Sequence, residues 1–328
     1  MRDRQGRIAV FSAPLGVLRR TGILAPLLVI LIATFGTLSP RFLSPLNIVS
    51  VVRQSTFLAI LAMGSMLPLI VGGFDLSIGA LMSLISVVST LVMKMGIFSS
   101  PILMVGLGIL AGILIALMTG VTNGLIIAVF GVSPFITTLA MMSITAGVAL
   151  IIAKGVPIFG IPEIFSKTLA GDIVGIPVPI VATILIAIVG YVLMNWTHLG
   201  RFFWAIGGNI NAAKLSGIST RGYTILAYTI CAFLAGISGT LLTARVGSGE
   251  LTLGATLMMK AIAAAVLGGT AVGGGKGNIP GVLLGAFFIT LLVNGMNLVG
   301  LGSFVQQVVL GALLIFAITV DRYFQRAR

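Results

Sequence analysis

Long apolar runs occupy most of this chain and restrict it to very few folds. They lie at about residues 22–38, 56–71, 78–93, 101–130, 135–153, 178–194, 223–244, 257–272, 279–299 and 304–320. A transmembrane helix needs about 20 mostly apolar residues, and backbone groups in lipid are satisfied only in helices or closed barrels. The runs show no alternation of polar and apolar residues, which argues against a barrel. We therefore expect an all-α polytopic membrane bundle of about ten transmembrane helices, some of them broken or re-entrant.

The charge content argues against a soluble protein. Charged residues make up only 8% of the chain and hydrophobic residues 58%, whereas a soluble domain carries about 25% charged residues. The formal net charge of +13 comes from basic residues spread thinly between apolar runs, so we expect no nucleic-acid partner. Membrane lipid is the expected surrounding, and residues 1–328 are expected to form one transmembrane domain.

The distribution of Lys and Arg predicts the orientation, because cytoplasmic loops are enriched in these residues. With ten crossings and a cytoplasmic N-terminus, twelve of the 19 basic residues lie on the cytoplasmic side and six on the outer side. Both termini are then cytoplasmic, with tails at 1–21 and 321–328, and the largest cytoplasmic loop is 195–222. We interpret the first run as an uncleaved helix, since residues 37–40 form a poor signal-peptide cleavage site.

Glycine, with 43 residues, has two expected uses. Helices in lipid associate through small residues that allow close backbone contact. This predicts a packing stripe at Gly108, Gly112, Ala116 and Gly120, and a second at Gly281 and Gly285. A smooth surface along which a substrate slides is the alternative.

Other glycines lie where a helix should break. Gly72 and Gly73 precede the segment 74–79, and glycines at 268–269 and 273–275 interrupt the eighth run. The run at 101–130 could also be two pieces. Broken helices at membrane depth are tolerated only beside protein or a water-filled path. These breaks therefore indicate a conduit, although no convincing internal repeat accompanies them.

Asp75 is the only acid in the first 160 residues apart from Asp3. A carboxylate near the bilayer is costly unless it is partnered or hydrated. With Gly73 and Ser77, it could lie on a permeation path or in a structural network at the helix break. Its position before the run 78–93 favours a helix N-cap, and these roles can coexist.

Four further polar residues lie within apolar runs. Asn294 and Asn297 share a helix face, and Asn123 lies in an earlier run. Their amides could bind the hydroxyl groups of a solute on its pathway, or clamp neighbouring helices, and we favour clamping. Lys260 has no acid three or four residues away, and we expect it to snorkel to the outer surface.

No catalytic or cofactor site is expected in this chain. The stretch 273–277 resembles a phosphate-binding loop only superficially, since Thr270 stands where that loop needs Gly and Gly277 where it needs Ser or Thr. The single His198 cannot form a multi-histidine metal site. We therefore expect no enzymatic activity, metal or cofactor in this chain alone.

The loop 195–222 is the most informative stretch. Asn209 is a good N-cap for a short helix over 212–215, and Gly217 suits the position after its end. A short helix at the cytoplasmic surface indicates a docking element for a partner, and a simple interfacial connector is the alternative. The candidate docking residues are Gly207, Gly208, Asn209, Ala212, Ala213, Lys214 and Gly217.

Three stretches resemble the permease subunit of ribose/xylose-type ABC sugar importers. Residues 72–79, Gly-Gly-Phe-Asp-Leu-Ser-Ile-Gly, are similar to the family's Gly-Gly-Ile-Asp-Leu-Ser-Val-Gly, with Phe74 in place of Ile. Residues 205–218 resemble its cytoplasmic signature, and 267–277 its late Gly-rich segment, with 294–298 near the matching end. The likeness covers about 45–320, in the family's order.

The resemblance implies an inner-membrane subunit that pairs with a second copy or a paralogue. It would receive a monosaccharide from a periplasmic or lipid-anchored sugar-binding protein. A separate ATPase, which binds ATP-Mg, would dock on the loop carried over to 207–217 and drive alternating access. No cofactor would be bound by this chain.

Three other functions remain as alternatives. An ABC permease for branched-chain amino acids belongs to the same broad superfamily, but the Asp-Leu-Ser stretch favours the sugar branch. An ion-coupled secondary transporter needs an ionisable relay inside the spans, and this chain offers only Asp75 and Lys260. A structural membrane protein would not need the docking loop.

Overall fold

The computed structural model describes residues 24–326. The predicted N-terminal tail and residues 327–328 lie outside the described residues. The described part contains thirteen helices and one two-stranded hairpin. In chain order these are α2 (Leu24–Leu38), α3 (Pro45–Ile70), α4 (Ile78–Lys94), α5 (Pro101–Ala128), α6 (Pro134–Ala153), α7 (Glu163–Leu169), β1 (Asp172–Ile173), β2 (Ile176–Pro177), α8 (Val178–Trp196), α9 (His198–Gly208), α10 (Ile210–Leu215), α11 (Thr220–Val246), α12 (Leu257–Leu267), α13 (Ile279–Leu298) and α14 (Ser303–Arg326).

The ten predicted apolar runs all coincide with helices. Six helices are long and apolar enough to cross a membrane, namely α3, α5, α6, α8, α11 and α13. Shorter apolar helices occupy the other four runs, as α2, α4, α12 and the segment Ser303–Thr319 of α14. The prediction of a polytopic helical bundle is therefore confirmed.

Several boundaries differ from the predictions. The run 101–130 is one helix, α5. Helix α3 begins eleven residues before the predicted start, because Pro45 suits a first turn and the Ser44 hydroxyl accepts a hydrogen bond from the Asn47 amide. Helix α12 ends at Leu267 rather than 272, at the interruption predicted for glycines 268–269, where Gly268 is the C-cap and Gly269 has a φ of 90°. Residues 321–326 continue α14.

The two small-residue stripes pack helices together, as predicted. A methyl group at Gly112 would lie 2.5 Å from the Ser89 hydroxyl of α4, and one at Gly120 would lie 2.7 Å from the Thr229 backbone of α11. The second stripe lies against α12, where Gly285 contacts the Ala264 carbonyl. Since side chains would separate these helices, small residues are required for the observed distances.

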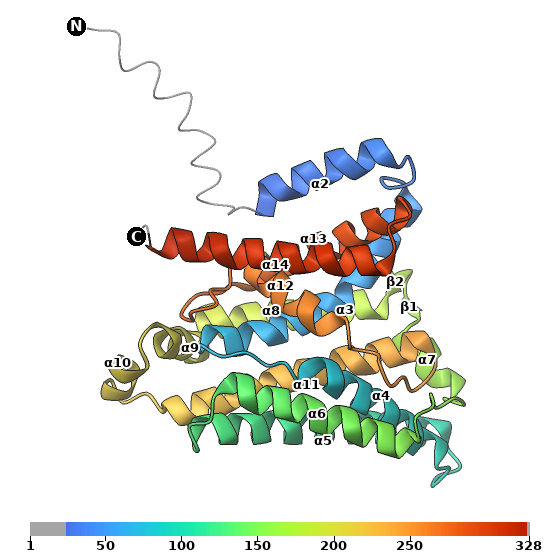
Figure 1. The fold of residues 1–328 in the computed structure, drawn as a ribbon. Coiled ribbons are helices and arrows are strands. Elements are labelled where there is room, and N and C mark those ends of the chain that lie inside the picture. Colours follow the sequence, from blue (N-terminus) through green and yellow to red (C-terminus); the bar gives the residue numbers. More distant parts are fainter. Residues whose placement is uncertain (1–23, 327–328) are drawn as a thin grey trace, which may run out of the picture.

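The bundle has two distinct ends (Figure 1). One end carries α9 and α10, and we call it the α10 end; the other carries α7 and the β1–β2 hairpin, and we call it the α7 end. Helix α3 lies between them, and its residues 55–70 are all buried. The sequence did not predict α7, the hairpin or α9 as ordered elements.

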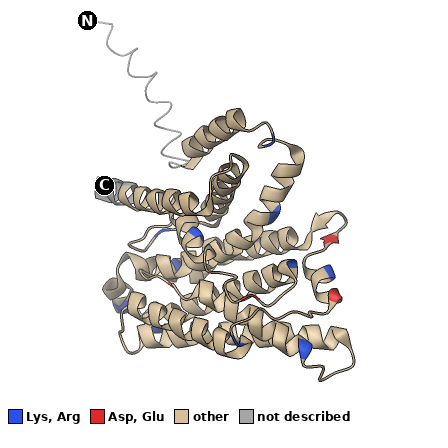
Figure 2. Ribbon diagram, turned by 45° about the vertical axis from the view of Figure 1, so that its right-hand side comes forward, with Lys and Arg blue, Asp and Glu red and all other residues tan. Residues whose placement is uncertain are grey.

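Charge is distributed unevenly between the two ends. At the α7 end, Arg53 contacts Asp172 at 3.2 Å, and Lys167 donates a 2.7 Å hydrogen bond to Glu163. This hydrogen bond and the Lys167 charge hold the pKa of the exposed Glu163 below its ordinary value. Figure 2 shows blue, basic positions among the helices of the α10 end and red, acidic positions at the α7 end.

Candidate functional site

Helices α9 and α10 form a compact elbow after α8. The Thr197 hydroxyl accepts from the Leu199 amide at 3.1 Å and donates to the Leu193 carbonyl at 2.6 Å, which joins α8 to α9. Phe202 and Phe203 then pack edge-on against Tyr223 of α11, with ring centroids 5.0 and 6.0 Å apart. The elbow is thus held to the membrane helices by aromatic packing.

Helix α10 has the ends that the sequence predicted. The Asn209 side chain accepts hydrogen bonds from the amides of Asn211 and Ala212, each at 3.0 Å. Gly217 follows the helix with a φ of 79°, and the amide of Ile218 donates to the Ala213 carbonyl at 3.1 Å. Glycine is favoured at this position because its φ is positive.

The predicted docking residues have different structural roles. Ala212 and Lys214 are exposed, whereas Ala213 is only 3% exposed and packs inward. Leu215, which was not among the candidates, is 91% exposed. Ile210 at the start of α10 is 54% exposed. Two apolar side chains therefore project from the α10 end beside a basic one, and their position in a capped helix outside the apolar runs is the signal that could have identified them.

Two Gly-rich stretches that are distant in sequence meet at α9. The Gly275 amide donates a 2.8 Å hydrogen bond to the Ile70 carbonyl at the end of α3. A methyl group at Gly207 would lie against both the Ile70 carbonyl and the Gly275 amide. We call this contact of Ile70, Gly207 and Gly275 the glycine junction. It connects the α9–α10 elbow to α3 and to the loop before α13.

The structure brings together four of the six candidate pathway residues, at the break between α3 and α4. Asp75 accepts hydrogen bonds from the Ser77 amide and hydroxyl at 2.9 and 2.6 Å. The Asn123 amide of α5 donates to the Ser77 hydroxyl at 3.1 Å. A methyl group at Gly73 would meet the Tyr228 hydroxyl of α11, which itself donates to the Phe74 carbonyl at 3.3 Å. These side chains form a network enclosed by α5 and α11.

The predicted N-cap position of Asp75 is wrong by two residues. Ser77 occupies the N-cap of α4 and makes no side-chain cap bond. Asp75 precedes it and binds the Ser77 amide, so the carboxylate stabilises the turn that leads into the helix. Asp75 is 3% exposed and takes part in neither of the ion pairs found among residues 24–326.

Asn294 and Asn297 lie elsewhere and connect helices. Asn294 and Asn47 of α3 exchange two hydrogen bonds, each 2.9 Å long. The side-chain oxygen of Asn297 accepts a 2.6 Å hydrogen bond from the side-chain amide of Gln306 in α14. The predicted clamping interactions are therefore present in the structure, at a site separate from the Asp75 network.

The prediction that the Lys260 side chain snorkels to the outer surface is wrong. The segment between α11 and α12 returns along α4 from Thr90 to Gly79 before α12 begins. These eleven residues of helix correspond to about 16 Å. Lys260 therefore lies too far from the α7 end for its side chain to reach that surface.

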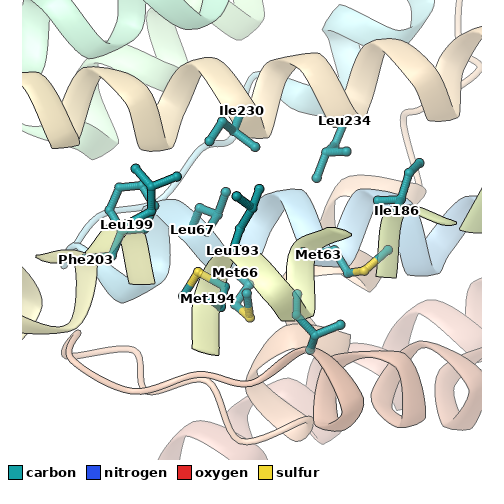
Figure 3. Close-up of a pocket in the computed structure, with 12 residues that line it drawn as sticks. Met63, Met66, Leu67, Ile186, Leu193, Met194, Leu199, Phe203, Ile230 and Leu234 are labelled. Atoms are coloured by element: carbon teal, nitrogen blue, oxygen red, sulfur yellow. The ribbon is translucent and has the colours of Figure 1, made fainter. Parts of the chain in front are cut away.

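A cavity of about 50 Å³ lies between α3, α8, α9, α11 and α13 (Figure 3). Its wall consists of apolar side chains and Gly190, and includes Met63, Met66 and Met194. A hydroxyl-rich solute needs hydrogen-bonding partners, and no polar side chain lines this space. The cavity is therefore a poor candidate for binding a polar solute.

Comparison with known proteins agrees with the resemblance noted from the motifs. The family described as branched-chain amino acid transport system / permease component matches residues 47–318. The ribose import permease protein RbsC of Bacillus subtilis (strain 168) is 38% identical over 309 residues, covering 94% of each chain. The D-allose transport system permease protein AlsC of Escherichia coli (strain K12) is 35% identical over 297 residues, covering 90% of each chain.

A further relative, the ribose import permease protein RbsC of Escherichia coli (strain K12), is 36% identical over 298 residues, which cover 90% of this chain and 91% of the relative. No solved structure matches the chain. The family match extends over most of the sequence and over nine of the ten apolar helices. The chain is therefore a multi-pass membrane protein that belongs to the family of transport-system permease components.

Proposed function

We propose that this chain is the membrane-spanning subunit of an ATP-driven importer that moves a monosaccharide across the inner membrane by alternating access. The observation that carries the proposal is the nearly full-length similarity to permeases named for ribose and D-allose. Such a subunit does no chemistry of its own and needs an external source of work.

The alternatives have less support. The family description mentions branched-chain amino acids, but the relatives above are named for sugars. An ion-coupled transporter needs ionisable groups that exchange ions along a path. Asp75 is enclosed by its hydrogen bonds, and the described residues contain no ion pair that involves Asp75 or Lys260.

The partners follow from the two ends of the bundle. We place a separate ATPase, with its ATP-Mg, at the α10 end, where Leu215 and Ile210 offer apolar contacts and Lys214 a charge. That end is cytoplasmic in this proposal, as are both termini. A periplasmic or lipid-anchored sugar-binding protein would approach the α7 end, and a second permease copy or paralogue would complete the transporter. This chain binds no cofactor.

The docking surface can be tested with two matched substitutions. Leu215→Asp places a charge on an apolar side chain of α10 that is 91% exposed, and Val174→Asp does the same at the α7 end, where Val174 is 96% exposed. We expect Leu215→Asp to reduce co-purification of the partner ATPase by at least about tenfold, the effect of losing about 1.4 kcal/mol of binding free energy. Uptake of D-ribose or D-allose should fall equally.

Val174→Asp should retain the ATPase at the wild-type level. Equal loss for both variants would indicate general damage rather than docking, and full retention by Leu215→Asp would reject the α10 surface. A wild-type chain that accumulates either sugar with no ATPase present would contradict the ATP-driven function itself.

A further inference from the structure

The bundle contains two stretches of irregular backbone beside α4, and they differ in what covers them. The first, 71–77, joins α3 to α4. The second, 247–256, joins α11 to α12. Irregular backbone at membrane depth is tolerated only where protein buries it or where it lines a water-filled cavity, because lipid offers no hydrogen bonds.

The first stretch is covered by protein. Asp75 and Ser77 are 3% and 0% exposed. One Asp75 carboxylate oxygen accepts from Ser77, whose hydroxyl accepts from Asn123, while the other Asp75 oxygen and the Asn123 amide oxygen are buried with no hydrogen-bond partner among the described residues. The Phe74 carbonyl accepts from the buried Tyr228 hydroxyl. This break is therefore covered by protein rather than exposed.

The second stretch enters the bundle to a similar depth. The Glu250 amide donates to the Ser86 hydroxyl at 3.0 Å, next to Gly249, which packs on Thr90. Four residues later, Gly254 lies against the Gly79 backbone at the start of α4. Figure 1 shows the chain returning from the α7 end before α12 begins. The stretch thus passes about 16 Å of helix α4.

One side of the second stretch is exposed and polar. Thr252, Ala255 and Thr256 are exposed, and Lys260 on the first turn of α12 is partly buried. Only the opposite side, with Gly254 and Leu251, faces α4 and its neighbours. Against hydrocarbon, this surface would leave hydroxyl, ammonium and irregular backbone groups without partners, at a cost of several kcal/mol.

We propose that residues 252–260 line the water-filled path through which the solute crosses the membrane. The Thr252 and Thr256 hydroxyls and the Lys260 ammonium supply hydrogen-bond donors along it, and the hydroxyls also supply acceptors. A neutral polyhydroxylated solute matches these groups, and that part of the inference rests on the proposed function. The Asp75 network lies on the covered side and acts as a structural support.

Aqueous access to this surface can be measured with single cysteines. The native Cys231 is fully buried, so the wild-type chain serves as the blank. Thr252→Cys and Thr256→Cys would be treated in lipid nanodiscs with a charged methanethiosulfonate reagent, which reacts with the thiolate. Met118→Cys on α5, where Met118 is 69% exposed in an apolar helix, is the lipid-facing control, and Leu215→Cys is the water-facing control.

We expect the two threonine positions to react at least about tenfold faster than Met118→Cys, since each unit of pKa rise in an apolar setting lowers the thiolate fraction about tenfold. Rates equal to that of Met118→Cys would overturn the proposal. This result depends on neither the ATPase nor the solute.

Transport by hydroxyl variants tests the role in solute passage. With the ATPase and binding protein present, Thr256→Val should raise the KM for D-ribose or D-allose uptake several-fold, and Thr256→Ser should restore it. Unchanged KM in Thr256→Val, together with unchanged KM in Thr252→Val, would overturn the assignment to solute contact. Reactive cysteines in a protein that transports neither sugar would support the water path and count against the proposed substrate class.

Discussion

At the scale of single residues, the break after α3 depends on one small residue. A methyl group at Gly73 would meet the Tyr228 hydroxyl and lie 3.1 Å from the Pro134 ring. Tyr228 is fully buried and cannot move into solvent. The lack of a side chain at Gly73 therefore allows α11 and α6 to close over the break, which keeps Asp75 away from lipid.

We predict that Gly73→Ala lowers the unfolding free energy by about 1–3 kcal/mol, the usual cost of overpacking a dense core. The measurement is thermal denaturation of the purified protein in one detergent. Tyr228→Phe, which removes the clashing oxygen, should restore part of the loss in the double variant.

Gly147→Ala in α6 is the matched control, because nothing lies within 4 Å of a methyl group there. It should leave the denaturation temperature unchanged or raise it slightly, since Ala favours a helix more than Gly does. Equal destabilisation by Gly73→Ala and Gly147→Ala would contradict the steric argument.

At the scale of elements, local sequence predicted what local interactions determine. Helix α10 was predicted because its cap, Asn209, and its terminator, Gly217, act on neighbouring residues. The glycine junction was not, because Ile70, Gly207 and Gly275 are far apart in the sequence. The depth of α12 was also missed, since hydropathy identifies an apolar run but does not say where in the bilayer its helix starts.

The glycine junction leads to a prediction about coupling. Gly207→Ala would push α9 away from Ile70 and Gly275, so we expect fewer sugar molecules transported per ATP hydrolysed, by about fivefold or more if the contact loses about 1 kcal/mol. ATPase and uptake rates measured in the same proteoliposomes give this ratio.

Gly147→Ala in α6, outside the predicted docking loop, is the control, because a methyl group there has nothing within 4 Å. It should leave the ratio at the wild-type value. A wild-type ratio in Gly207→Ala, with normal complex formation, would mean that the junction is not used for coupling.

At the scale of the whole molecule, charge predicts orientation where the fold does not. The α10 end carries Arg201, Lys214, Arg221 and Lys276, while Glu163 and Asp172 lie at the α7 end. Basic loops are retained in the cytoplasm. Of the predicted architecture, the apolar runs correctly located the helices, while the sidedness that this rule gives stays a prediction. The exposed surface of the segment 247–256 could not be predicted from the sequence, because its exposure depends on which helix surfaces pack together.

We predict that the two ends label from opposite sides of the membrane. In intact cells, an impermeant thiol reagent should modify Val174→Cys at the α7 end and leave Leu215→Cys at the α10 end unmodified until the membrane is opened. Both side chains are more than 90% exposed in the wild-type chain, and Cys231 is fully buried, so differences in labelling report sidedness rather than burial. Labelling of Leu215→Cys from outside would place α10 where no cytoplasmic ATPase can reach it. Because the two variants mark opposite ends of the same bundle, that single result would reverse the predicted orientation of every span.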